Sequence, residues 1–290
     1  MIDNRLNDNR MRADLIERIN KTFRTDFIRI PESSIGTINP DYYGNNNDHG
    51  GIEIYGNSIG AYDLHAYFNS ECRILYVLKE PYIPKKSFDN KDNPDRGGHN
   101  QTEEYAEYSY EDFDYENKTY AEIIRNCYSI VTKKEFIPDA SVIEHAMRIF
   151  HNNVSIINVN YFPAVKTTKS NNTFIGRWAA KNEEILTMLF RLYNPTIIVG
   201  GNTLTALYHH ECNDKGLLFN ENVSVLWHDE IIRLTQTSKL NRDSYYNPNH
   251  LFLNLVHPSY CPRNSQEKQY WKEIRTAIIK LVDWWENGRA

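Results

Sequence analysis

The chain has 290 residues and a formal net charge of −5, with 40% hydrophobic residues. This length suits one large domain or two small ones with a real hydrophobic core. The negative charge argues against broad, non-specific nucleic-acid binding but allows a local basic groove. No apolar run approaches the roughly 18 residues of a membrane span, and the polar first residues lack the apolar core of a signal peptide. We therefore expect no membrane association and no export.

The four cysteines lie far apart in the sequence and form no Cys-x-x-Cys pair: Cys72, Cys127, Cys212 and Cys261. This spacing argues against a zinc site or an iron–sulfur cluster. Free thiols are typical of a reducing compartment. We therefore expect a cytoplasmic protein without a metal.

The predicted elements alternate between helices and strands along most of the chain. Apolar residues four apart predict an amphipathic helix near 8–23, and a short helix is expected at 60–69. The run ILYVL, which Pro81 stops, predicts a buried strand at 74–78. A polar linker is expected between 227 and 249. Further strands are expected at 154–159, 196–199, 223–227 and 251–256, and further helices at 120–132, 141–150, 178–193, 203–208 and 266–285.

The alternation of strands and helices predicts an α/β fold, a three-layer α/β/α sandwich with a central, mainly parallel sheet. No internal repeat divides the chain, so we expect one domain at 1–290, with an N-terminal extension at 1–70 and an acidic, Tyr-rich insertion at about 85–118. Long loops of this kind are often lids or binding segments. The alternative is a solvated acidic surface whose tyrosines pack back onto the domain.

Polar side chains gather at four predicted strand ends: LKEPY at 78–82, INVNYFP at 157–163, VGGN at 199–202 and HPSY at 257–260. In open α/β sheets, ligands bind at the edge formed by the carboxyl ends of the strands. The Gly-Gly turn before a predicted helix could also cradle a phosphate, although close packing of helix and strand explains the two glycines equally well.

In order and spacing these strand ends resemble the uracil-DNA glycosylase superfamily, from about residue 73 to the C terminus. The resemblance implies an α/β/α fold that takes a base out of DNA and hydrolyses its N-glycosidic bond without a cofactor. The first family motif is Gly-Gln-Asp-Pro-Tyr, Gly-Glu-Ala-Pro-Gly or Gly-Met-Asn-Pro-Gly. Alignment on Pro81 puts Leu78 at the family glycine, Glu80 at the position that handles the hydrolytic water, and Tyr82 at the tyrosine that walls the base pocket.

The same resemblance assigns roles at the later strand ends. Asn158 matches the asparagine that reads the pyrimidine edge; Asn160 is the alternative, because a slip in strand register changes which side chain faces the pocket. His257 matches the histidine that hydrogen-bonds the leaving base. Ser259 and Tyr260 belong to the loop that presses into the minor groove, with Tyr260 in place of a proline of the commonest branch.

Cleavage of an N-glycosidic bond develops positive charge on the sugar and negative charge on the base. Glu80 is the candidate to position or deprotonate water, His257 is the candidate to stabilise the base, and Phe88 is a candidate stacking partner. The structural alternatives are a solvated turn for Glu80, backbone capping for Asn158 and a hydrogen-bonding role for His257. Candidate phosphate contacts, or alternatively ordinary polar surface, are Lys166, Lys169, Arg177 and Arg263.

The sequence therefore predicts a monomeric DNA glycosylase that acts on uracil or another modified base and leaves an abasic site. The alternative is a catalytically silent protein of the same fold that binds DNA, or a protein partner through the acidic insertion. A third possibility is an N-glycoside hydrolase that acts on free nucleosides.

Overall fold

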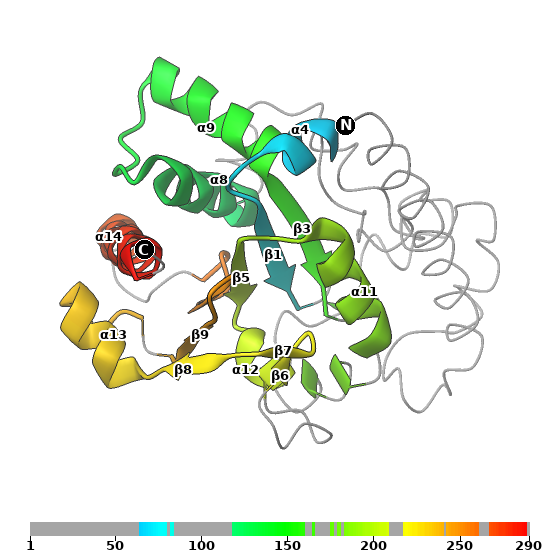
Figure 1. Cartoon of the computed structure of the whole chain (residues 1–290). Coiled ribbons are helices and arrows are strands. Elements are labelled where there is room, and N and C mark those ends of the chain that lie inside the picture. Colours follow the sequence, from blue (N-terminus) through cyan, green and yellow to red (C-terminus); the bar gives the residue numbers. More distant parts are fainter. Residues whose placement is uncertain are drawn as a thin grey trace.

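The computed structural model in Figure 1 describes residues 64–79, 82–83, 118–159, 164–165, 175–176, 179–180, 183–208, 217–240, 242–260 and 267–288. Its helices are α4 (Leu64–Asn69), α8 (Lys118–Thr132), α9 (Ala140–Asn153), α11 (Glu183–Tyr193), α12 (Leu204–Tyr208), α13 (His228–Thr235) and α14 (Glu267–Asn287). The strands of the main sheet are β1 (Ile74–Leu78), β3 (Val154–Asn158), β5 (Ile197–Gly201), β8 (Ser224–Leu226), β9 (Ser244–Tyr246) and β10 (Leu251–Leu255). Two short pairs join β2 (Tyr82–Ile83) to β4 (Ala164–Val165) and β6 (Leu217–Leu218) to β7 (Glu221–Asn222).

The main sheet has the strand order β3-β1-β5-β10-β9-β8. The first four of these strands are parallel, and β9 and β8 add an antiparallel edge. Every residue of β1, β3, β5 and β10 is buried, as expected of parallel strands covered on both faces. The predicted α/β sandwich with a mainly parallel sheet is therefore confirmed.

Helices cover both faces of the sheet, with α8 and α14 on one face and α11 and α12 on the other (Figure 1). The side chains of β1 alternate between the two resulting cores. Ile74, Tyr76 and Leu78 pack on the α8–α14 side, whereas Leu75 and Val77 pack on the α11–α12 side. A residue's place along a strand therefore decides which layer its side chain enters.

The prediction of a polar linker between 227 and 249 is wrong, because this segment contains α13 (His228–Thr235) and β9 (Ser244–Tyr246). Ile231 of α13 is fully buried, and so is Tyr245 of β9. Tyr246 also makes an edge contact with Trp284 of α14, with ring centroids 5.1 Å apart. These short elements depend on partners far away in the sequence. The predicted helix near 8–23 and nearly all of the insertion lie outside the described residues.

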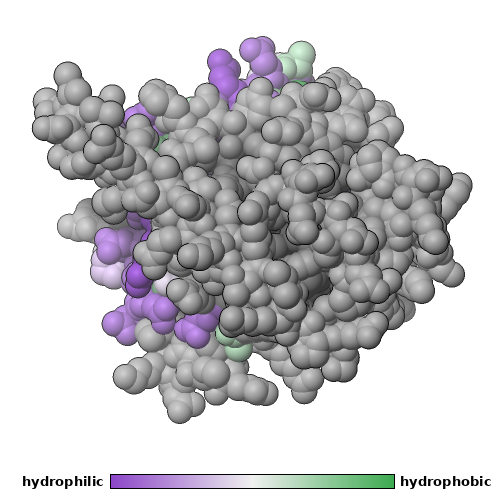
Figure 2. All heavy atoms as spheres, turned by 90° about the vertical axis from the view of Figure 1, so that its right-hand side faces the viewer, coloured by the Kyte–Doolittle hydropathy of each residue, from purple (hydrophilic) through white to green (hydrophobic). Residues whose placement is uncertain are grey.

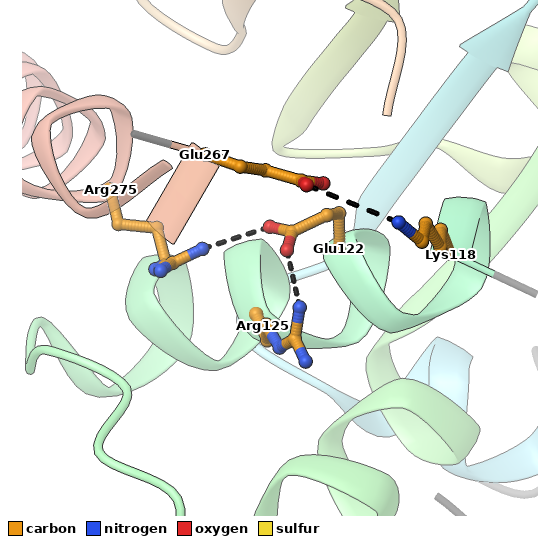
Figure 3. Close-up of polar contacts among 5 residues, drawn as sticks. All are labelled: Lys118, Glu122, Arg125, Glu267 and Arg275. Atoms are coloured by element: carbon orange, nitrogen blue, oxygen red, sulfur yellow. Dashed lines mark hydrogen bonds and ion pairs between the residues drawn. The ribbon is translucent and has the colours of Figure 1, made fainter. Parts of the chain in front are cut away.

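Ion pairs connect α8 to α14 on one side of the sheet (Figure 3). Glu122 is buried and accepts a 2.9 Å hydrogen bond from Arg275, which is also buried. Arg125 also pairs with Glu122, and Lys118 lies 4.0 Å from Glu267. The pairs advance in the same direction along both helices, so α8 and α14 pack in parallel.

No helix in the described ranges is long and apolar enough to cross a bilayer. The described residues visible in Figure 2 are mostly hydrophilic, with small hydrophobic areas among them. Among the residues that the structure describes, the exposed large hydrophobic side chains are Ile137, Trp227 and Tyr260.

Candidate functional site

The four parallel strands end level with one another at one edge of the sheet. Leu78 of β1 lies opposite Asn158 of β3, and Gly201 of β5 lies opposite Leu255 of β10. The register between β1 and β5 joins the two pairs into one row, in the order Asn158, Leu78, Gly201, Leu255. The row brings together the four strand ends that the sequence marked as polar.

The segments that follow β1 and β3 stay side by side beyond this row. The backbone N–H of Val159 donates to the carbonyl of Leu78 at 2.8 Å, and Tyr82 of β2 then pairs with Ala164 of β4. The chain on either side of Glu80 therefore runs next to the chain that leaves Asn158. The two motifs are neighbours in space, as a shared pocket requires.

The turn after β5 is shaped by close packing between strand and helix. A Cβ atom on Gly200 would lie only 2.4 Å from Cγ of Leu204, the first residue of α12. Thr203 is buried and donates from its hydroxyl to the carbonyl of Val77 on the neighbouring strand, at 2.7 Å. Packing therefore accounts for the first glycine of the pair.

His257 lies in the loop after β10, and its ring is held by Ser259. The backbone N–H of Ser259 donates to Nδ1 of His257 at 3.2 Å, and the Ser259 hydroxyl oxygen lies 2.7 Å from the same atom. Because a backbone N–H can only donate, Nδ1 is an acceptor, and the neutral ring carries its proton on Nε2. The loop therefore presents an N–H donor on the other side of the ring.

The charge state of His257 follows from its surroundings. Burial, and then the positive charge of Lys79, lowers the pKa of His257 from its usual 6.5 to about 4. Lys79 directly follows β1, two strands away from β10 in the sheet. At neutral pH the edge therefore carries a neutral imidazole donor within the field of an ammonium group.

Gly201 allows His257 to approach the sheet. A Cβ atom at Gly201 would lie 3.0 Å from Cδ2 of Leu78, 3.3 Å from Cδ of Pro258 and 3.4 Å from Cδ2 of His257. The loop after β10 and the end of β1 thus meet above a residue that has no side chain. Leu78 stands where the resembling family has glycine, and in this fold a glycine on the adjacent strand provides space beside it.

Asn158 stands on the opposite side of Leu78 from this contact. It is 2% exposed and shares a register row and a sheet face with Leu78. Two strand spacings, about 10 Å, separate Asn158 from Gly201 and thus from the loop carrying His257. Asn158 and the loop carrying His257 therefore flank Leu78, whose side chain is itself buried.

The structure thus brings Asn158, His257 and the loop residues Ser259 and Tyr260 to one edge of the sheet, and it places the backbone of Tyr82 beyond that edge. Within the described ranges, no group of three or more His, Cys, Asp or Glu side chains could hold a metal ion. The remaining candidates lie outside the described residues: Glu80, Phe88, Asn160, Lys166, Lys169, Arg177 and Arg263.

Sequence reasoning missed contributions from Lys79 and Asn254. The charge of Lys79 acts on His257, although the sequence showed only that a lysine follows the strand. Asn254 is buried within β10 and donates to the Thr205 hydroxyl at 2.8 Å, while its Oδ1 has no hydrogen-bond partner among the described residues. A polar residue within the apolar run LFLNLV is the signal that could have identified it.

The fold and the edge residues define a class: an α/β protein with a mainly parallel sheet and a polar cluster at the carboxyl ends of its strands. Comparisons of the chain with protein-family models, with curated proteins and with solved structures found no match.

Proposed function

We propose that this protein is a DNA glycosylase that hydrolyses the N-glycosidic bond of uracil or another modified base. The observation that carries the proposal is the neutral His257, held by Ser259 with its donor on Nε2, in the field of Lys79. The resemblance of the four strand ends to the uracil-DNA glycosylase superfamily supports the same function. DNA is the proposed partner, and the monomeric state and cytoplasmic location stay predictions.

The proposed chemistry at His257 is stabilisation of an anion. When the bond between sugar and base breaks, the bonding electrons leave with the base, and negative charge develops on its oxygen. The Nε2–H of His257 would donate to that oxygen, and the ammonium group of Lys79 would stabilise the same charge through space. Both interactions strengthen as charge develops, so they favour the transition state over bound substrate.

The proposed chemistry at the sugar needs water and a carboxylate. The oxygen of water forms the new bond to the sugar carbon that the base leaves, and its proton passes to Glu80. Tyr82 would cover one side of the extruded base, and the amide of Asn158, with its donor and acceptor, would read the base edge. The pairing of β2 with β4 supports this grouping, because it keeps the chain near Tyr82 beside the chain that leaves Asn158.

The test is incubation of the full chain with single-stranded and duplex oligonucleotides, each carrying one of several modified bases, followed by alkaline cleavage at abasic sites. We expect cleavage with at least one base and a loss of about 100-fold or more in Glu80→Gln and His257→Ala. His145→Gln is the matched control, because His145 is an exposed histidine on α9. Wild-type rates in both site variants would overturn the assignment. No cleavage of any substrate, with DNA binding retained, would favour the catalytically silent alternative.

A further inference from the structure

A second group of cationic and aromatic side chains lies beside the His257 loop. Tyr260 ends the turn that His257 begins, with a 2.8 Å hydrogen bond from its N–H to the His257 carbonyl. The Tyr260 ring lies 5.6 Å from that of Tyr270, in the first turn of α14. The ammonium group of Lys239 lies 5.9 Å from the centre of the Tyr270 ring. Three chain segments therefore meet at one place next to the proposed base pocket.

Arg242 joins this group through its electrostatic interaction with Tyr270. Its Nε atom is buried, and it has no hydrogen-bond partner among the described residues. Burial lowers the pKa of Arg242, and Tyr270 is the group that opposes this shift. A desolvated guanidinium N–H without an acceptor is costly for a folded protein. A bound anion would supply the missing acceptor.

No carboxylate within the described ranges forms an ion pair with Lys239 or Arg242. Glu267, the acidic residue in the first turn of α14, is directed toward Lys118 (Figure 3). Asp243 accepts a hydrogen bond from the backbone of His228. Two cations therefore interact with the ring of Tyr270. That ring contacts Tyr260, a residue that is 47% exposed, in a protein whose net charge is negative.

We propose that Lys239, Arg242 and Tyr260 form a subsite for a nucleotide that flanks the base to be excised. The two cations bind its phosphate, and the exposed ring of Tyr260 stacks on its base. Arg suits a phosphate because its N–H donors form a planar fork, and an aromatic ring accepts any base on its face. The inference rests on the proposed function. It adds a contact to the DNA strand beside the excised base, and of its three residues only Tyr260 belongs to one of the four strand-end motifs.

Binding of undamaged DNA tests the subsite without any need for base excision. The probe is a short fluorescein-labelled oligonucleotide of ordinary bases, single-stranded or duplex, and its anisotropy is followed against the full chain at several salt concentrations. The slope of log K against log salt is negative, and each lost phosphate contact reduces its magnitude by about 1. We expect a magnitude smaller by about 1 in Lys239→Gln and in Arg242→Gln, because each cation contacts one phosphate in the proposed subsite. The control Arg148→Gln, at an exposed arginine on α9, should keep the wild-type slope.

The tyrosine has its own matched pair of variants. Tyr260→Ala should weaken binding about tenfold at fixed salt and leave the slope unchanged, whereas Tyr260→Phe should bind like wild type. Thermal melting separates binding from folding. Arg242→Gln removes a buried donor without an acceptor, so its Tm should not fall. If its Tm falls steeply, Lys239→Gln alone decides the phosphate contact.

Unchanged slopes in both cation variants would overturn the subsite, even if the protein excises a base. Slopes of smaller magnitude in the cation variants of a protein that excises no base would support the subsite and refute only the proposed function. Polyglutamate is the competing probe for an acidic protein partner. If it displaces the oligonucleotide, and if Tyr260→Ala does not affect oligonucleotide binding, the surface fits an acidic polypeptide and the nucleotide assignment fails.

Discussion

Ser259 fixes the tautomer of His257, because its backbone N–H donates to Nδ1 at 3.2 Å while its hydroxyl oxygen lies 2.7 Å from the same atom. Such a pair is favoured by the short His-Pro-Ser spacing, in which the turn after His257 folds back onto the ring. The consequence is a directed donor on Nε2, which a mobile surface histidine would lack.

Removal of the Ser259 hydroxyl should weaken this arrangement without abolishing it. Ser259→Ala keeps the backbone N–H, so we expect excision to slow by about tenfold, the value of one hydrogen bond, with little change in Tm. Ser259→Thr retains the hydroxyl and should restore most of the rate. The measurement is single-turnover cleavage of the preferred substrate. A wild-type rate in Ser259→Ala would show that the backbone donor alone orients the ring.

Protonation of His257 should also be visible in the pH dependence of stability. The unfolded chain binds a proton at His257 near pH 6.5, whereas the folded protein does so only near pH 4. The unfolded state therefore binds more protons between these values, and stability falls as the pH is lowered through this range. The contribution lost by pH 4 is up to about 3 kcal/mol.

Urea unfolding of wild type and His257→Gln from pH 7.5 to pH 4 measures this contribution. The difference in unfolding free energy between the two proteins should change by up to about 3 kcal/mol as the pH falls from about 6.5 to about 4. His151 also has its pKa lowered by burial, and it remains in both proteins, so its effect cancels. Parallel curves for wild type and variant would place the pKa of His257 near its usual value.

The sequence predicts the central strands because their burial leaves a simple signal. The run at 74–78 is apolar throughout, and β1 has those bounds. In contrast, α13 and β9 were missed, because short, mostly polar segments become ordered only through distant partners such as Trp284, which contacts Tyr246. The sequence also predicted that polar residues follow four of the strands. Their level alignment depends on sheet register, and strands that are buried on both faces have no polar–apolar alternation to fix that register.

The site shows the same division between local and long-range information. His-Pro-Ser is a local motif, so the sequence marked His257 and Ser259 as candidates. The influence of Lys79 on His257 crosses two strand positions in the sheet. The absence of a side chain at Gly201 matters only because Leu78 and His257 converge there.

The two adjacent glycines of β5 should respond differently to alanine. Gly200→Ala places Cβ 2.4 Å from Cγ of Leu204, inside the core, and should destabilise the fold by about 3 kcal/mol. Gly201→Ala meets Leu78 at 3.0 Å and His257 at 3.4 Å, so we expect a loss of about 1 kcal/mol and a displaced imidazole. Urea unfolding and single-turnover excision distinguish a core defect from a site defect.

For Gly201→Ala the expected result is slow excision by a protein that is still folded. For Gly200→Ala it is a low Tm, with near wild-type excision by the molecules that remain folded. An unchanged rate in Gly201→Ala would mean that the His257 ring tolerates displacement, which contradicts its role as a positioned donor.

The buried pair between Glu122 and Arg275 should dominate the stability of the α8–α14 interface. Both side chains are buried, and they are joined by a 2.9 Å hydrogen bond, so loss of the Glu122 carboxylate removes the anionic partner of a guanidinium group held away from water. Glu122→Gln should cost about 3–5 kcal/mol, measured by urea unfolding. Glu122→Leu with Arg275→Met should recover part of this loss, because it removes both charges of the buried pair, whereas Arg125, which also loses Glu122, is partly exposed to water. Lys133→Gln, at an exposed pair with Asp283, is the control and should cost less than about 1 kcal/mol. Equal losses in the buried and the exposed variants would show that water reaches Glu122, and α8 and α14 would then be held together by their apolar residues alone.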